Sequence, residues 1–306
     1  MSTVDFRVIG ERVRNWGRWG PDDEVGTLNL LTADRVAAAA RLVSSGRRFD
    51  LGIPLDDKGP QTGRRRTNPL RFMRALGPEQ VGEHAFRYAD DYVFMPLQAG
   101  SQWDALAHVY YDDLHYNGYP AAETLSVRGA ARLSIDRIQG GIVGRGVLLD
   151  VARYLGVGWL DAGQPIGPDL LDAVADAQGV AVGEGDILAV RTGWRRKFVT
   201  ESDPDSFMAG EPGLTVDCAV WLADRDVAAV CSDNWAVEVH PAGGGELLPF
   251  HLVAIRDMGL TLGEMFDLEA LSAACADEGR YEFFFSGAPL RFTHAVGSPV
   301  NPIALL

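Results

Sequence analysis

The stretch Met95-Pro-Leu-Gln-Ala-Gly-Ser-Gln-Trp-Asp-Ala-Leu-Ala-His108 places four polar side chains at spacings of four, two and four residues. They are Gln98, Gln102, Asp104 and His108, and their positions all have the same parity. Side chains alternate between the two faces of a β-strand, so an extended chain puts these four on one face, whereas a helix scatters them. The pattern therefore predicts either a site built on a strand or an ordinary half-buried strand with a solvated polar face.

The overall composition is typical of a soluble globular protein. The chain has 306 residues, 47% of them apolar and 23% charged, which is enough for a large core. The net charge of -14 argues against a nucleic-acid partner and against an anionic membrane surface. Composition does not shift along the chain and no repeat or linker is evident, so we expect a single domain over residues 1–306.

The N-terminal segment, residues 1–16, has no apolar core and no small-residue cleavage site, so it is not expected to be a signal peptide. No apolar run reaches the ~18–20 residues that a membrane helix needs. We therefore expect a cytoplasmic protein. The three cysteines, Cys218, Cys231 and Cys275, are widely spaced in apolar company, which predicts buried thiols and neither a disulfide framework nor a zinc knuckle.

Local patterns predict helices and strands along the whole chain. Caps and helix formers indicate helices over residues 32–43, 167–178, 214–225 and 268–277. Apolar runs indicate strands over residues 48–55, 146–151, 185–194, 227–240, 281–285 and 289–292. The glycine cluster Gly140–Gly146 is not a dinucleotide-binding loop, because its spacing is not GxGxxG and a strand follows it where a helix is required.

Two further segments have an unusual composition. Residues 57–82 are predicted to be a loop from their glycines and prolines, and they contain Arg64, Arg65, Arg66, Arg71 and Arg74. This cluster is either a solvated loop or a rim that attracts an anionic substrate. The tyrosine-rich segment 109–119 is either an aromatic wall beside a site or an exposed surface loop.

Several common catalytic motifs are absent from the sequence, namely the GxSxG elbow, HExxH, the P-loop and the EF-hand loop. What remains is a scattered set of oxygen and nitrogen groups. The candidate ligands and bases are the carboxylates and imidazoles Asp104, His108, His251 and Glu264, together with the amides Gln98 and Gln102. The remaining histidines, His84, His115, His240 and His294, are expected to be structural.

The segment from Gln98 to His108 resembles the signature of the cyclase family of metal-dependent hydrolases, His-x-Gly-Thr-His-x-Asp-x-Pro-x-His. That family includes bacterial kynurenine formamidase and isatin hydrolase. The match holds at Gly100, Asp104 and His108, and a serine replaces the threonine. The likeness extends to three other segments and a residue pair: 15–20, 191–194, 232–235, and His251 with Glu264.

The segment departs from the signature at three positions. Gln98 and Gln102 stand where the family has histidines, and Leu106 stands where it has proline. Because of its two glutamines, the segment most closely resembles the branch of the family typified by trans-dienelactone hydrolase. An amide oxygen is neutral and is a weaker metal ligand than imidazole. Oxygen-rich sites shift the metal preference from zinc toward manganese or magnesium.

The resemblance implies a mixed α/β protein with a mainly β core and flanking helices, the swivelling β/β/α fold. It also implies homo-oligomers whose neighbours border the active site. In the family's pattern a divalent metal, here Zn²⁺ or Mn²⁺, is bound by Gln98, Gln102, Asp104, His251 and Glu264. His108 then acts as general acid/base.

These roles predict a hydrolase that opens a small cyclic ester or amide, such as a lactone, imide or formamide-like substrate. Metal-activated water attacks the carbonyl, and His108 passes a proton to the leaving group. Two alternatives remain open. One is a biosynthetic cyclase or dehydratase that uses the same site, and the other is a non-catalytic small-molecule-binding protein that has lost its metal.

Overall fold

A computed structural model describes residues 5–77 and 85–306 of the chain. Its main feature is a nine-stranded sheet of order β1-β15-β13-β7-β9-β11-β12-β4-β14. The strands of this sheet are β1 (Arg48–Asp50), β4 (Gln102–Asp104), β7 (Val143–Asp150), β9 (Ile187–Arg191), β11 (Ala229–Ser232), β12 (Thr261–Glu264), β13 (Glu282–Ser286), β14 (Gly297–Pro299) and β15 (Ile303–Leu305). The predicted mixed α/β class is confirmed.

The middle of the sheet is parallel and its outer parts are antiparallel. Strands β7, β9, β11 and β12 run parallel to one another, and β4 joins β12 in the antiparallel sense. Because both faces of β9 and β11 are covered, most of each of these strands is a continuous apolar run. In β7, Val147 and Leu149 belong to one apolar core, and Leu148 belongs to the core on the opposite face.

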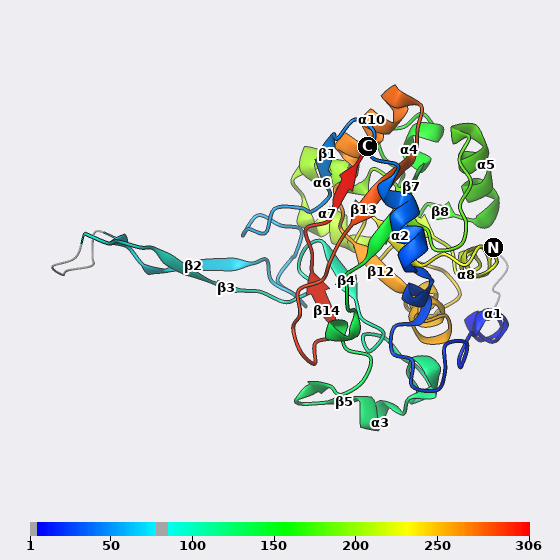
Figure 1. Cartoon of the computed structure of the whole chain (residues 1–306), viewed down its shortest axis with the longest axis horizontal. Helices are drawn as coiled ribbons and strands as arrows, with labels where there is room; N and C mark the ends of the chain where they lie inside the picture. Colours follow the sequence, from blue (N-terminus) through cyan, green and yellow to red (C-terminus); the bar gives the residue numbers. More distant parts are fainter. Residues whose placement is uncertain (1–4, 78–84) are drawn as a thin grey trace.

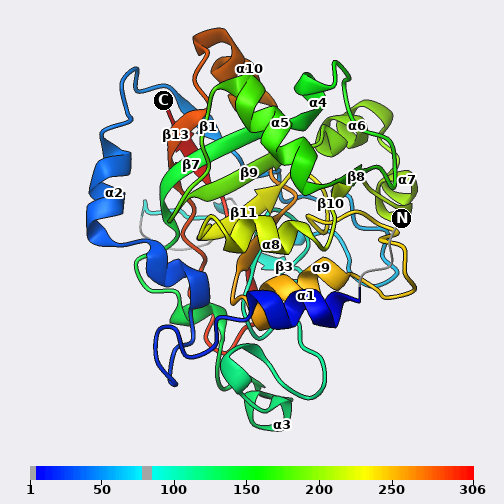
Figure 2. The same cartoon turned by 90° about the vertical axis from the view of Figure 1, so that its right-hand side faces the viewer.

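Helices cover both faces of the sheet (Figure 2). Helices α5 and α8 contribute Leu171 and Leu222 to the first core, and α10 contributes Leu271 to the second. The α-helices of the described residues are α1 (Phe6–Val13), α2 (Ala33–Ala40), α3 (Ala121–Thr124), α4 (Val151–Tyr154), α5 (Pro168–Gln178), α6 (Trp194–Glu201), α7 (Pro204–Ala209), α8 (Cys218–Ala223), α9 (Pro249–His251) and α10 (Glu269–Glu278). A π-helix over Leu252–Asp257 directly follows α9.

The helix ends follow the sequence signals. The Thr32 side chain accepts a hydrogen bond from the Arg35 amide at the start of α2, as expected of an N-cap. Helix α5 begins with Pro168 and ends at Gly179, which has the left-handed conformation that favours glycine after a helix. The predicted helices at these two places are confirmed.

Three short sheets lie outside the central one. They are the pairs β8 (Pro165–Ile166) with β10 (Gly213–Leu214), β5 (Leu125–Ser126) with β6 (Gly129–Ala130), and β2 (Leu70–Ala75) with β3 (Asp90–Phe94). The β2–β3 hairpin projects from the body of the molecule as a long arm (Figure 1).

Outside residues 98–108, two of the secondary-structure predictions are wrong. Residues 57–82 were expected to form a loop, but they contain β2, whose pairing with β3 cannot be seen in its own sequence. A strand was expected over residues 289–292, but this segment is irregular. Pro289 has no N–H to donate, and the Leu290 amide is taken by the Ser298 hydroxyl.

Two other expectations concern thiols and membranes. All three cysteines are buried free thiols, as predicted. Within residues 5–77 and 85–306, no helix has both the length and the apolar character needed to span a membrane.

Candidate metal centre

Strand β4 presents two polar side chains on one face and a large aromatic side chain on the other. Gln102 lies opposite Glu264 of β12 across the antiparallel ladder. Trp103 points to the other face, where its ring contacts Phe266 edge-on at a centroid distance of 5.3 Å. A Cβ on Gly263 would lie 2.6 Å from the Trp103 ring, so glycine is needed there for the tryptophan to pack. Burial of Trp103 therefore fixes which way Gln102 and its neighbour Asp104 point.

The predicted strand over the whole 98–108 stretch is wrong, because β4 covers only Gln102–Asp104. Gln98 and His108 lie in turns on either side of it. The Ser101 hydroxyl donates to the main-chain oxygen of Met265 and accepts from the Ile53 amide, which fixes the chain just before β4.

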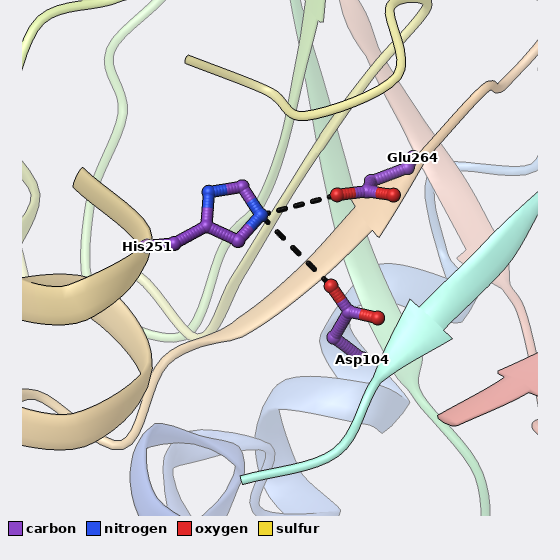
Figure 3. Close-up of side chains that lie close together, drawn as sticks. All are labelled: Asp104, His251 and Glu264. Carbon is purple, nitrogen blue, oxygen red and sulfur yellow. Dashed lines mark hydrogen bonds and ion pairs between the residues drawn. The ribbon is translucent and has the colours of Figure 1, made fainter. Parts of the chain in front are cut away.

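Three of the predicted metal ligands converge at the carboxyl end of β12 (Figure 3). The His251 Nε2 atom lies 3.1 Å from Glu264 Oε1 and 4.0 Å from Asp104 Oδ2. One ligand atom from each of the three residues lies within 4.8 Å of the other two. Asp104, His251 and Glu264 are all buried, so this is a compact group of two carboxylates and one imidazole shielded from solvent.

Glu238 holds the histidine in place. Its carboxylate accepts hydrogen bonds from the His251 main-chain amide at 2.8 Å and from the Phe250 amide at 3.0 Å. The same carboxylate lies 2.7 Å from His251 Nδ1. A carboxylate at Nδ1 fixes the ring orientation and leaves Nε2 facing the other carboxylates, which is how metal-binding histidines are commonly oriented.

The fourth predicted ligand, Gln102, contacts both carboxylates through its amide nitrogen. Its Nε2 atom donates to Glu264 Oε2 at 2.5 Å and to Asp104 Oδ1 at 3.4 Å. Its Oε1 atom and the Oδ2 atom of Asp104 are buried without a hydrogen-bond partner among the described residues. Buried polar atoms normally have hydrogen-bond or metal partners, so these two oxygens are candidates to bind a cation.

The electrostatics of the group agree with this conclusion. Burial alone would lower the pKa of His251, but hydrogen bonds to Glu238 and Glu264 outweigh it and raise the pKa to about 10. Burial and the nearby Asp104 carboxylate raise the pKa of Glu264 to about 7. Three buried carboxylates thus surround one imidazole, and this excess of negative charge favours a cation.

The remaining two predicted site residues flank the group. The Gln98 side chain lies against Gly297 of β14, where an added Cβ would be 2.7 Å from its Nε2. Within the described part of the chain, no hydrogen bond joins this side chain to the other candidates. His108 Nε2 lies 3.8 Å from Asp104 Oδ1. Burial lowers the pKa of its imidazole, Asp104 opposes this effect, and Arg66 adds to it.

A cavity of about 490 Å³ opens onto the group. His108, His251 and Glu264 line one part of it. Its other lining residues are the cations Arg64, Arg65 and Arg66, the polar residues Gln61, Thr62, Asp205 and His240, and the apolar residues Val109, Met208, Ala209, Trp235, Ala236, Leu247 and Leu248. Three of the five clustered arginines therefore belong to the cavity wall, whereas Arg71 and Arg74 lie on β2. Of the tyrosine-rich segment, only Val109 belongs to the described lining.

Sequence reasoning missed two residues of this region. Glu238 falls within the strand predicted over residues 227–240, where an acidic residue between Val237 and Val239 is a signal of a buried functional group. His240 was expected to be structural, yet it lines the cavity and its ring lies 5.3 Å from that of Trp235. His84 lies outside the described residues.

Comparison with known proteins shows the family. Residues 49–239 match a family model described as "putative cyclase". The crystal structure of a protein described as a novel cyclase superposes with a TM-score of 0.89 at 38% identity, covering 96% of this chain and 100% of that one. No curated protein matches the chain.

Two more distant structures share the fold. Isatin hydrolase A from Ralstonia solanacearum has a TM-score of 0.64 at 19% identity, covering 89% of this chain and 97% of its own. A predicted metal-dependent hydrolase from Bacillus stearothermophilus has a TM-score of 0.53 at 18% identity, covering 85% and 98%. The closer likeness to trans-dienelactone hydrolase stays a prediction. From the matched family model and the 38% identical cyclase, we conclude that this chain belongs to the cyclase family.

Proposed function

We propose that this protein is a metal-dependent hydrolase that opens a small cyclic ester or amide. The observation that carries the proposal is the buried group of Asp104, His251 and Glu264 at the base of an open cavity. The names of the structural neighbours, isatin hydrolase and metal-dependent hydrolase, support the same reaction class.

The residues present fit a divalent cation. Asp104, Glu264 and His251 supply two anionic oxygens and one imidazole nitrogen, and the unpartnered Oε1 of Gln102 can supply a neutral oxygen. We assign Gln98 as a further ligand from the family pattern alone. The donor set is mainly oxygen, which suits Mn²⁺ as well as Zn²⁺. Hydrogen bonds to Glu238 and Glu264 raise the pKa of His251 to about 10, so a cation bound at its Nε2 atom would compete with a proton.

A divalent cation held by Asp104, His251 and Glu264 would polarise a substrate carbonyl and lower the pKa of water. His108 is placed to move the proton, because it lines the cavity beside Asp104. Burial keeps its imidazole neutral near pH 7, so it can accept a proton from water and return it to the leaving oxygen or nitrogen. Glu238 holds His251 in one orientation throughout.

We further propose that the substrate is anionic. Arg66 lines the cavity and is close enough to affect the ionisation of both His108 and Glu264. Its Nη1 atom donates to the main-chain oxygen of Gln98 at 3.1 Å, which anchors the guanidinium and leaves further N–H donors for a ligand. The apolar wall, which includes Trp235 and Leu248, suits the ring of a small molecule.

Replacing Arg66 by glutamine is expected to weaken kcat/KM for a carboxylate-bearing lactone by about 10- to 100-fold, the cost of a charge-assisted hydrogen bond. For a matched neutral lactone, kcat/KM should fall much less. Steady-state kinetics on the two substrates measure this difference. The control is Arg71→Gln on the projecting arm, where Arg71 pairs with Asp91 and neither residue lines the cavity. An equal loss for both substrates would contradict anion recognition by Arg66.

The hydrolase proposal is tested by metal analysis combined with a substrate panel. The purified protein, reloaded with Zn²⁺ or Mn²⁺, is expected to open a lactone, imide or formamide and to lose this activity on chelation. Undiminished ring-opening activity after complete removal of the metal would contradict the proposal. Ring closure of open-chain acids without any ring opening would instead identify the biosynthetic cyclase alternative.

A further inference from the structure

The tyrosine-rich segment 109–119 is anchored to the π-helix that follows α9. The Tyr111 hydroxyl donates a hydrogen bond to Asp257 Oδ2 at 2.7 Å, and Asp257 is fully buried at the end of the π-helix. The Arg256 Nε atom donates a second hydrogen bond, to the main-chain oxygen of Leu114, at 3.2 Å. Two hydrogen bonds to neighbouring residues of the π-helix therefore hold the segment against it.

Helix α1 encloses the hydrogen bond between Tyr111 and Asp257, because it lies along the π-helix (Figure 2). A Cβ on Gly10 of α1 would clash with Asp257 Oδ2 and lie 3.1 Å from the Tyr111 hydroxyl, so a larger residue there would displace the carboxylate. The Oδ1 atom of Asp257 accepts from Arg14 and Arg256, which leaves Oδ2 for the tyrosine. Burial and the Asp257 hydrogen bond raise the pKa of Tyr111 to about 12, so its hydroxyl keeps its proton and donates near neutral pH.

The backbone of segment 109–119 indicates that such contacts impose its shape. Asp112, Asp113 and Asn117 have left-handed backbone conformations, with φ angles of 49°, 56° and 59°. These conformations are unfavourable for a residue with a side chain and persist only where the surroundings hold them. The segment begins directly after His108, so the contacts that fix the segment also fix where the main chain of His108 lies.

The other end of this junction leads to the candidate metal centre. The π-helix begins directly after His251, the last residue of α9, and Asp257 is the last residue of the π-helix. π-Helices are rare and are frequently found at functional sites. The junction therefore joins the loop that carries His108 to the helix that carries His251, and both histidines line the same cavity.

We propose that Tyr111 and Asp257 are positioning residues, whose hydrogen bond holds the loop of His108 in place against the helix of His251. This inference rests on the proposed function, which makes His108 the proton carrier and His251 a metal ligand. A general acid/base must lie within hydrogen-bond reach of the proton that it moves, and a displacement of about 1 Å can cost about 100-fold in rate. Neither Tyr111 nor Asp257 lines the cavity, so they act through His108 and not on the substrate.

The test is Tyr111→Phe, which removes the hydroxyl but keeps the ring and its contact with the Arg256 guanidinium. In the metal-loaded protein we expect kcat for ring opening to fall about 10-fold, the value of one hydrogen bond to a charged group. KM and metal content should stay at the wild-type level. The control is Tyr110→Phe, the same change one residue earlier, because the Tyr110 hydroxyl forms no hydrogen bond within residues 5–77 and 85–306. This control should leave kcat unchanged.

A double variant separates positioning of His108 from a general loss of stability. If Tyr111 acts through His108, Tyr111→Phe should lower kcat no further when it is combined with His108→Gln. An additive loss in the double variant overturns the proposal, and so does an unchanged kcat in Tyr111→Phe alone. If Tyr111→Phe does not fold, Gly10→Ala gives a second measurement, because its Cβ would press on Asp257 Oδ2. It should lower kcat in the same way, and an unchanged kcat there also overturns the proposal.

Amide exchange of the metal-loaded protein tests the junction without any substrate. The amides of residues 108–114 and 252–257 should exchange about 10-fold faster in Tyr111→Phe than in Tyr110→Phe, because only the first variant loses a hydrogen bond between the two segments. Equal exchange in the two variants overturns the junction. A wild type that opens none of the ring substrates contradicts the proposed function instead, and the exchange result still decides whether the junction holds the two segments together.

Discussion

Replacing Asp104 by asparagine is expected to abolish binding of the divalent metal and, with it, turnover. The substitution keeps the shape of the side chain but removes one of the two anionic oxygens of the group. The loss of metal affinity should exceed the roughly 10- to 100-fold that loss of an outer-shell partner costs. Metal content after dialysis and calorimetric titration of Zn²⁺ or Mn²⁺ measure it.

The same variant should increase the stability of the metal-free protein. In the wild type, burial and the Asp104 charge together raise the pKa of Glu264, so the two carboxylates repel when no cation is present. Removing the Asp104 charge relieves this repulsion and should raise the melting temperature of the metal-free protein. A ligand that binds only the folded state stabilises it, so the melting-temperature gain on adding metal should vanish in the variant.

The matched control is Asp205→Asn, which makes the same substitution at another cavity-lining residue. Asp205 is exposed and pairs with Arg64, away from the buried group. This control should retain metal content and the metal-induced melting shift. An Asp104→Asn protein that still gains full thermal stability from the metal would show that Asp104 is not a ligand.

The sequence alone predicted the local part of the site and of the fold. Same-face placement of Gln102 and Asp104 is correct over three residues of strand, because alternation is a property of the backbone itself. Helices α2 and α5 were also predictable, because their caps are local signals. These features need no knowledge of which segments meet in space.

The rest of the site depends on contacts between distant segments. Glu264 lies beside Gln102 because β12 pairs with β4, and no spacing rule states that pairing. His251 comes from the end of α9, and its orientation depends on Glu238 in a third segment. Family resemblance pointed to His251 and Glu264, but it did not point to Glu238.

The other family-like segments have structural roles in the fold. The Asp233 carboxylate accepts hydrogen bonds from the Thr192 amide at 2.8 Å and the Thr192 hydroxyl at 2.6 Å. It also accepts one from the Gly193 amide at 2.7 Å. These bonds join the chain just after β11 to the chain just after β9. Trp16 donates its indole N–H to the main-chain oxygen of Arg256 at 2.9 Å. All three segments therefore tie the body together, and Trp235 of the third also lines the cavity that opens onto the candidate metal centre.

The second large effect is expected from replacing His108 by glutamine. The turnover number should fall by about 100- to 10,000-fold, the usual contribution of a general acid/base. The metal content should stay at the wild-type level, because His108 is not among the three convergent ligands. The structural reason is that His108 Nε2 lies beside Asp104 while the side chain remains partly open to the cavity. Separate measurement of kcat, KM and bound metal distinguishes loss of proton transfer from loss of the metal.

The matched control is His240→Gln, since His240 lines the same cavity but contacts Trp235 and not the metal group. We expect it to change KM more than kcat, because its ring lies on the cavity wall against Trp235 and not against Asp104, Glu264 or His251. If His240→Gln lowers kcat while His108→Gln does not, His240 is the proton carrier and the assignment is wrong. If His108→Gln loses its metal, His108 acts as a ligand, and its assignment as the proton carrier is wrong.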